Sequence, residues 1–178
     1  MRRLGAALLV VLTAGSGLGC GYALAGRGSF LPSYIQSIGV PVFSNRTTVF
    51  NVETVLTEKV RSEFISRGRY TIQPQAQGVD AVLVGEVTGV DLQPVTIGAS
   101  GIASRYVIIM RASIQFRDLR TNTVLWENPS VAYREDYDAP SDQRSLNAAD
   151  FFGQEINALD RIASDFARSI VSGILEAF

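Results

Sequence analysis

The sequence predicts an α+β fold: a two-layer sandwich in which two helices pack on one face of a four-stranded, mostly antiparallel sheet. Two segments, residues 52–67 and 147–176, repeat apolar residues at steps of three and four, as a helix with one buried stripe does. Between them, residues 80–92, 105–117 and 123–136 have the composition of strands, and the middle one alternates strictly. Two helices with one apolar stripe each require a shared sheet face on which to bury it.

The fold is expected to begin with a strand at residues 37–43, "SIGVPVF". Because Pro41 cannot donate a backbone hydrogen bond, we expect this strand at an edge of the sheet or with a bulge. The first helix follows over residues 52–67, with Asn51 as its N-cap and Gly68 in the left-handed conformation after its last turn. The order of elements is therefore strand, helix, three strands, helix.

The second predicted strand, residues 80–92, carries two glycines, and a hairpin tip is expected over residues 94–104. Gly85 and Gly89 are four residues apart, so they would lie on the same side of a regular strand. A side lined by glycine would let a helix approach closely.

The third predicted strand, residues 105–117, has two distinct sides. Alternation places six apolar side chains toward the helices: Tyr106, Ile108, Met110, Ala112, Ile114 and Phe116. The opposite side mixes basic, polar and apolar residues: Arg105, Val107, Ile109, Arg111, Ser113, Gln115 and Arg117. With both helices on one face, this side is left uncovered and is expected to be a partner surface. A solvated face that carries a few apolar residues is the alternative.

The last strand and the last helix complete the expected fold. Asn128-Pro129 should mark a bulge or bend within residues 123–136. A single long helix is expected over residues 147–176. Its apolar stripe consists of Phe152, Ile156, Leu159, Ala163, Phe166, Ile170 and Ile174.

The composition limits the classes of function. The chain has 178 residues, of which 47 % are hydrophobic and 19 % charged, and this favours one folded domain over a disordered chain. The absence of histidine excludes an imidazole base, a Ser-His-Asp triad and histidine metal ligands. One cysteine cannot form an internal disulfide. A formal net charge of −1 is not that of a nucleic-acid-binding domain.

The amino terminus resembles a bacterial lipoprotein signal. Arg2 and Arg3 form a positive region, residues 4–12 are apolar, and "LGC" at residues 18–20 resembles a lipobox. We expect the Cys20 thiol to carry a diacylglyceryl group, with a further acyl chain such as palmitate on the new amino terminus. An ordinary secretory leader that leaves a free thiol is the alternative.

This signal divides the chain into three predicted parts. Residues 1–19 are the signal peptide that is removed, residues 20–33 a glycine-rich lipidated tether, and residues 34–178 a single α+β domain. By the same resemblance, Gly21 after the cysteine favours sorting to the outer membrane.

A series of short motifs runs through the chain from Cys20 to Asp138. In order, they are "CGYALAG", "LP" at residues 31–32, "IGVPVFSNRT", "VE..LT..V...F", "GRY.I", "DAVLVGEV" and "SRYVIIMRASIQF.D....VLW.N". Their order and spacing resemble the LPS-assembly lipoprotein family, LptE. The resemblance implies two helices on a four-stranded sheet, which agrees with the layout inferred from the residues.

The resemblance also implies a function. Members of the family are held at the outer membrane, on its periplasmic side, by their lipid. They plug the lumen of the LPS translocon LptD, a large β-barrel, assist its assembly and bind lipopolysaccharide on its way to the outer leaflet. The expected partners are therefore an LptD-like barrel, lipopolysaccharide and the membrane, with no nucleic acid, no enzymatic activity and no cofactor besides the lipid on Cys20.

The candidate contacts for lipopolysaccharide are arginines, because a guanidinium suits phosphate and the interleaved Val107 and Ile109 suit acyl chains. Arg105 is the first candidate since it opens its strand directly after the hairpin tip. The others are Arg111 and Arg117 on the same side of that strand, and Arg144 in the loop before the last helix. As an alternative, cross-strand pairing would neutralise these arginines with Glu86, Glu127 or Glu135.

Other functions fit parts of the sequence. A periplasmic lipoprotein of another envelope machine, curli-secretion-like or Tol-associated, would share this layout. A lipid-anchored hydrolase would need paired carboxylates in a pocket, which no spacing predicts. Asp136, Asp138 and Asp142 could ligate calcium, but they lack the glycine and the terminal glutamate of an EF-hand, so a solvated strand end is favoured.

Overall fold

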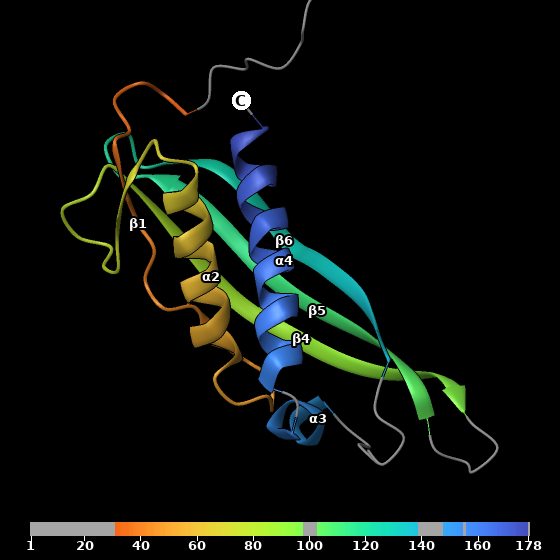
Figure 1. Ribbon diagram of the computed structural model, residues 1–178. Helices are drawn as coiled ribbons and strands as arrows, with labels where there is room; N and C mark the ends of the chain where they lie inside the picture. Colours follow the sequence, from red (N-terminus) through yellow and green to blue (C-terminus); the bar gives the residue numbers. More distant parts are fainter. Residues whose placement is uncertain (1–30, 98–102, 139–147, 155, 178) are drawn as a thin grey trace, which may run out of the picture.

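The computed structural model describes residues 31–97, 103–138, 148–154 and 156–177. The described chain forms two layers, a sheet and a layer of helices on one of its faces (Figure 1). The predicted fold class is therefore confirmed. The predicted signal peptide, Cys20, the centre of the hairpin tip and Arg144 lie outside the described residues.

The sheet contains more strands than predicted. Its strands are β1 at Ser37–Gly39, β2 at Ser44–Asn45, β3 at Thr71–Gln73, β4 at Ala81–Ile97, β5 at Ala103–Asp118 and β6 at Thr123–Asp138. Their order is β3-β1-β4-β5-β6, and β2 also pairs with β4. The long strands β4, β5 and β6 form an antiparallel meander, whereas the short strands pair in parallel. The short β2 and β3 are thus additions to the four expected strands.

The predicted first strand is interrupted. β1 ends at Gly39 and β2 begins at Ser44, with Pro41 in the break between them. β1 lies between β3 and β4, so of the two expected arrangements the edge position is wrong, and the irregularity at Pro41 takes the form of a break rather than a bulge. The break leaves the Val40 carbonyl without a strand partner, and the Arg61 guanidinium of the first helix donates to it at 2.8 and 2.7 Å.

The first helix, α2 at Val52–Ser66, matches its predicted bounds closely. Gly68 has a φ of 67°, the left-handed conformation expected after the last turn. Asn51 holds the predicted N-cap position, but its φ is 61° and its side chain makes no capping hydrogen bond. The Asn51 carbonyl still accepts from the Val55 N–H at 3.0 Å, which begins the helix.

The predicted single C-terminal helix is in fact two helices. α3 spans Ala148–Gln154 and α4 spans Ile156–Leu175, and they run in different directions (Figure 1). Gly153, near the end of α3, weakens helix continuation by about 1 kcal/mol. The separate direction of α3 also buries two adjacent aromatic side chains, Phe151 and Phe152, whereas a straight continuation of the α4 stripe would bury only Phe152.

The core lies between the helices and one side of the meander. All six side chains of β5 that were predicted to face the helices are buried: Tyr106, Ile108, Met110, Ala112, Ile114 and Phe116. The pairing of β5 with β6 shifts between Ala112–Val131 and Ile114–Asn128, so the predicted bulge at Asn128-Pro129 is confirmed. This shift decides which residues of β6 join the uncovered side.

The expectation for the two glycines of β4 is wrong. The register of β4 against β5 shifts between Val87 and Gly89, and this bulge adds one residue to β4. Gly85 therefore lies opposite Ile114 on the core side, while Gly89 lies opposite Arg111 on the uncovered side. The neighbour that Gly85 admits closely is Phe43 from the loop before β2, not a helix.

Candidate functional site

The candidate site is the open face, which we define as the side of β4, β5 and β6 that faces away from α2 and α4. The registers place three rows across it: Thr96–Arg105–Asp138, Gly89–Arg111–Ala132 and Val82–Arg117–Val124. Each of the three predicted arginines of β5 thus sits in the middle of a row. β4 and β5 run beyond α4 toward the hairpin tip, which extends this face past the helix layer (Figure 1).

Arg105 is paired within the sheet. Its Nε lies 2.8 Å from the Asp138 Oδ1 on β6, and both side chains are largely exposed. The hydrogen bond that Arg105 donates to this carboxylate, together with the Asp138 charge, raises the pKa of Arg105, and the Asp136 charge contributes further. An exposed ion pair of this kind contributes between about 0 and 1 kcal/mol, so a phosphate can compete for the guanidinium.

Arg111 crosses the face in the other direction. Its Nη2 forms a short ion pair with the Asp91 carboxylate of β4. To reach Asp91, the side chain passes over Gly89, where an added Cβ would lie 3.3 Å from the Arg111 Nε. The absence of a side chain at Gly89 therefore makes room for this arginine.

Arg117, at the far end of β5, has no carboxylate partner among the described residues. Its guanidinium donates to Asn122 Oδ1 at 3.2 Å and to Gln115 Oε1 at 3.1 Å. Neutral oxygens leave its charge uncompensated. Unlike Arg105 and Arg111, Arg117 could therefore bind an anion without first breaking an ion pair with a carboxylate.

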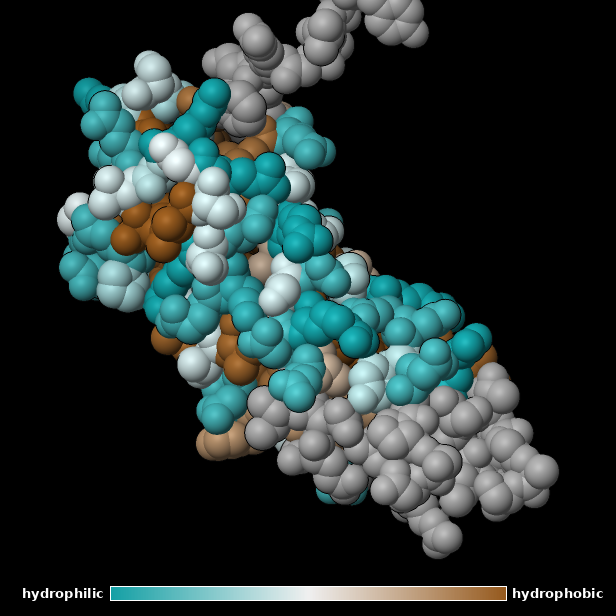
Figure 2. All heavy atoms as spheres, in the orientation of Figure 1, coloured by the Kyte–Doolittle hydropathy of each residue, from teal (hydrophilic) through white to brown (hydrophobic). Residues whose placement is uncertain are grey.

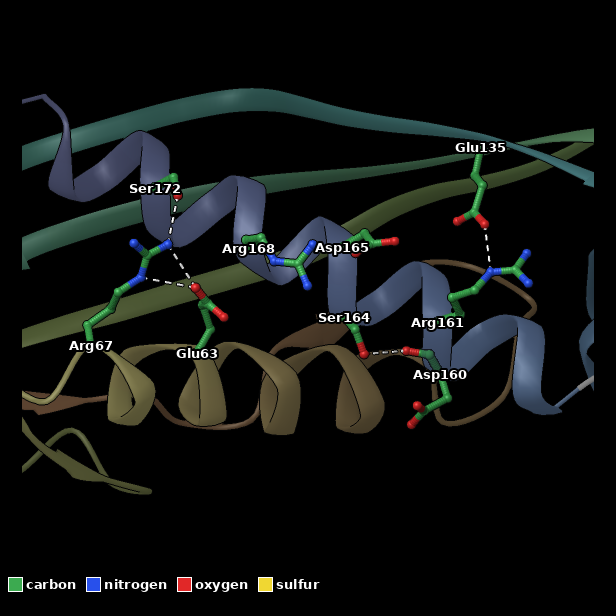
Figure 3. Close-up of polar contacts among 9 residues, drawn as sticks. All are labelled: Glu63, Arg67, Glu135, Asp160, Arg161, Ser164, Asp165, Arg168 and Ser172. Carbon is green, nitrogen blue, oxygen red and sulfur yellow. Dashed lines mark hydrogen bonds and ion pairs between the residues drawn. The ribbon is translucent and has the colours of Figure 1, made fainter.

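The carboxylates that were expected to pair with these arginines have other partners. Glu86 forms an ion pair with Arg46 at 2.7 Å, and Glu127 accepts from the Gln115 amide at 3.2 Å. Glu135 lies opposite Ile108, on the side of the helices, and pairs with Arg161 of α4 at 2.7 Å (Figure 3). The predicted pairing of arginines within the sheet does occur for Arg105 and Arg111, but with aspartates.

The apolar part of the open face is smaller than the alternation predicts. Val107 is only 2 % exposed and Ile109 is half-buried. At the other end of the face, Val84 and Val124 are more exposed. Apolar contacts are thus available mainly beside Arg117.

One cation of the open face was missed from the sequence. Arg134 of β6 lies opposite Ile109 and is exposed, and it forms no hydrogen bond or ion pair with any described residue. Its side of the strand depends on the bulge at Asn128-Pro129, because that bulge shifts the alternation by one residue. Continuing the alternation of side chains beyond the predicted bulge would have placed Arg134 on the open face.

The opposite side of the molecule presents a charged helix layer. Figure 2 shows this side, and hydrophilic surface predominates over the two helices, with separate hydrophobic patches beside them. Arg67, the residue after the last turn of α2, bonds Glu63 of α2 and Ser172 of α4 (Figure 3). Lys59 of α2 pairs with Asp160 of α4 at 2.7 Å. These contacts join the helices to each other.

A shallow depression of about 470 Å³ lies between β6 and α4, lined by Tyr133, Asp165, Arg168, Ser169 and Ser172. Burial and then the nearby Asp165 charge raise the pKa of Tyr133. Asp165 accepts from Arg168 at 2.8 Å, so the two charges of the depression compensate each other.

In the described part of the chain, no three metal-ligating side chains lie together, and no helix is long and apolar enough to cross a membrane.

Several of the solved structures to which this chain is similar are named lipoproteins. The uncharacterized lipoprotein B from Nitrosomonas europaea matches with a TM-score of 0.51 and 13 % identity, over 87 % of this chain and 90 % of its own. The hypothetical protein CT253 from Chlamydia trachomatis matches with a TM-score of 0.54 and 10 % identity, over 80 % and 97 %. The rare lipoprotein B from Shewanella oneidensis has a TM-score of 0.46 and 14 % identity, over 79 % and 98 %. No curated protein matches the chain.

The fold and the open face define a class: a two-layer α+β domain with helices on one side of a long meander and an uncovered, mixed basic and acidic face on the other. The family model LptE, described as lipopolysaccharide-assembly, matches residues 35–174. The chain belongs to this family, and the resemblance inferred from the motifs is confirmed. It is thus a lipopolysaccharide-assembly lipoprotein of a family that has no catalytic role and does not depend on a cofactor.

Proposed function

We propose that this protein is anchored to the outer membrane, on its periplasmic side, by lipid on Cys20. There it binds and plugs an LptD-like β-barrel, assists the assembly of that barrel and contacts lipopolysaccharide during delivery to the outer leaflet. The match of the LptE family over residues 35–174 carries the proposal, because it covers nearly the whole predicted domain.

The geometry of the open face supports contact with a phosphorylated glycolipid. Arg105, Arg111, Arg117 and Arg134 project from one surface of two neighbouring strands. Two of them are neutralised by aspartates in exposed pairs, and two have no carboxylate partner in the described chain. A phosphate group that approaches this surface can accept hydrogen bonds from Arg117 and Arg134 directly. It can also displace the Asp138 carboxylate from Arg105. Arg144 stays a predicted contact.

The proposal is tested by capture from native membranes. The full-length chain is purified with a C-terminal tag from detergent-solubilised outer membranes, and its partners are identified by mass spectrometry. We expect a large outer-membrane β-barrel in amounts comparable to the bait. We also expect label from a palmitate analogue on the wild type and none on Cys20→Ala.

Two results would contradict the proposal. One is a purified native protein with an unmodified Cys20 thiol and no barrel. The other is a complex with curli-secretion or Tol components, which would favour the alternative envelope machine.

A further inference from the structure

The loop between β2 and α2, residues 46–51, holds a large apolar side chain out in water. Phe50 is 84 % exposed, the highest exposure of any large hydrophobic residue in the described chain. Its neighbours on both sides, Val49 and Val52, are buried in the core. Because Val49 and Val52 are both held in the core, the Phe50 side chain between them is held in an outward direction.

The loop is rigid because the side chain of Asn45 uses its full hydrogen-bonding capacity inside it. The amide nitrogen donates to the Val49 carbonyl at 2.9 Å and to the Glu53 carboxylate at 2.8 Å. The amide oxygen accepts from the Thr47 N–H at 2.7 Å and from the Thr47 hydroxyl at 2.8 Å. One side chain thus closes the loop and joins it to α2.

A second set of contacts fixes the loop to the sheet. The Arg46 N–H donates to the Val87 carbonyl of β4 at 2.9 Å, and the Arg46 guanidinium pairs with Glu86 at 2.7 Å. The loop is therefore tied to β4 at one end and to α2 at the other, and it holds Phe50 in one place.

The residue after Phe50 has a left-handed backbone. Asn51 has a φ of 61° and a ψ of 4°, a geometry that glycine, asparagine and aspartate adopt readily. Asn51 carries the chain from the loop into α2 without a side-chain capping hydrogen bond.

We propose that residues 46–51 are a protein-docking element in which Phe50 enters an apolar pocket of a partner protein. Burial of a phenylalanine side chain makes a favourable contribution to binding, because it removes a large apolar surface from water. A rigid loop loses little conformational entropy on binding, so most of that contribution becomes affinity. Fixed aromatic side chains in central pockets are typical anchors of protein interfaces.

The surroundings of Phe50 favour a protein pocket over a lipid surface. A membrane-binding loop gains affinity from several apolar side chains, but here the exposed residues around Phe50 are polar: Arg46, Thr48 and Asn51. The charge of Arg46 is already compensated by Glu86. A fluid bilayer also gives no advantage to a loop of fixed shape.

For the identity of the partner, this inference rests on the proposed function: the protein that receives Phe50 is the β-barrel, and the pocket lies in its wall.

The test measures the affinity of the full-length chain for the purified barrel. Phe50→Ala is expected to weaken binding about tenfold or more, since the loss of roughly 1.4 kcal/mol corresponds to a factor of ten. Phe50→Leu should keep part of the affinity. One control should bind as the wild type does: Ile65→Ala, which removes an exposed apolar side chain from α2, outside the docking element. All three variants should melt at the wild-type temperature because the changed side chains are exposed.

A photo-crosslinking amino acid in place of Phe50 gives an independent reading in cells. Crosslinks to the barrel support the inference, while crosslinks to a second copy of this chain or to lipid overturn it. Unchanged affinity of Phe50→Ala for a barrel that the wild type does bind would also overturn it and leave the proposed function intact. A wild-type chain that binds no barrel would instead overturn the proposed function and, with it, the partner named here.

Discussion

Asp118, at the end of β5, is the one charged side chain that the described fold buries completely. Its carboxylate accepts from the Tyr34 hydroxyl, from the Thr121 hydroxyl at 2.8 Å and from the Arg120 N–H at 2.7 Å. Burial by itself raises the pKa of Asp118, but these hydrogen bonds outweigh it and hold the pKa below its ordinary value of 3.8. The contact joins the segment that leads into β1 to the turn between β5 and β6.

A second carboxylate strengthens the same junction. Asp80 accepts from the Ser37 hydroxyl at 2.7 Å, the Ser37 N–H at 2.9 Å and the Gln36 N–H at 3.0 Å. The hydrogen bond from the Ser37 hydroxyl contributes most to lowering the pKa of Asp80, followed by the two backbone N–H groups. Two aspartates thus fasten the start of the domain to the sheet.

These lowered pKa values predict that acid destabilises the fold. A carboxylate whose pKa is lower in the folded than in the unfolded state stabilises the fold above the unfolded pKa, and this contribution is lost as the pH falls through the folded pKa. Chemical denaturation should show falling stability below a pH of about 3.8. Asp118→Asn should lose about 1–3 kcal/mol at neutral pH and depend less on pH in acid. Equal pH dependence of Asp118→Asn and of the exposed control Glu176→Gln would contradict the assignment.

At the scale of elements, the bulge of β4 determines what each glycine does. An added Cβ at Gly85 would lie 2.8 Å from the ends of both the Ile114 and the Phe43 side chains. At Gly89 it would meet only the Arg111 side chain, at 3.3 Å and on the open face. The one inserted residue thus leaves Gly85 on the core side of β4 and places Gly89 on the open face.

Two matched substitutions test this separation. Gly85→Ala is expected to lower the free energy of unfolding by about 1–3 kcal/mol, because it overpacks the contact with Phe43 and Ile114. Gly89→Ala should change it by no more than about 0.5 kcal/mol, since Arg111 can move toward solvent. Urea denaturation of both variants measures the difference. Similar losses for the two would mean that both glycines face the core.

The elements show which features the sequence could predict. The alternation of β5 and the stripe of α2 follow from burial alone, and the structure confirms both. The bulge at Asn128-Pro129 was predictable because proline removes a ladder hydrogen bond. The bulge of β4 could not be placed, because a glycine within a strand can mark a bulge and this strand has two, Gly85 and Gly89. The division between α3 and α4 depends on Phe151, whose burial against Tyr106 and Tyr137 is a tertiary contact.

The candidate site was predictable to a similar degree. Alternation placed Arg105, Arg111 and Arg117 on one side of the sheet, and the structure brings them there. Their partners depend on register across three strands, which periodicity cannot supply. Asp138 and Asp91 were therefore missed as partners.

At the scale of the whole molecule, the two sides of the sheet differ in what they can bind. The helix layer carries exposed charges that pair within a helix, as Arg168 does with Asp165 at 2.8 Å, between the helices, or with β6, as Arg161 does with Glu135. The open face carries four arginines from neighbouring strands, and two of these have no carboxylate partner in the described chain. An anionic glycolipid should therefore prefer the open face.

A comparison of charge reversals on the two sides tests this preference. Arg105→Glu on the open face and Arg168→Glu on α4 change the net charge equally, and both arginines are exposed and paired with an aspartate. We expect Arg105→Glu to weaken lipopolysaccharide binding about tenfold, since a charged hydrogen bond is worth about 1.5–3 kcal/mol, while Arg168→Glu has little effect. Asp138→Asn should tighten binding, because Arg105 no longer has to leave a carboxylate. Titration of each purified variant with lipopolysaccharide in detergent gives the dissociation constants. If the two reversals weaken binding equally, net charge rather than the open face determines affinity, and the assignment of Arg105 fails.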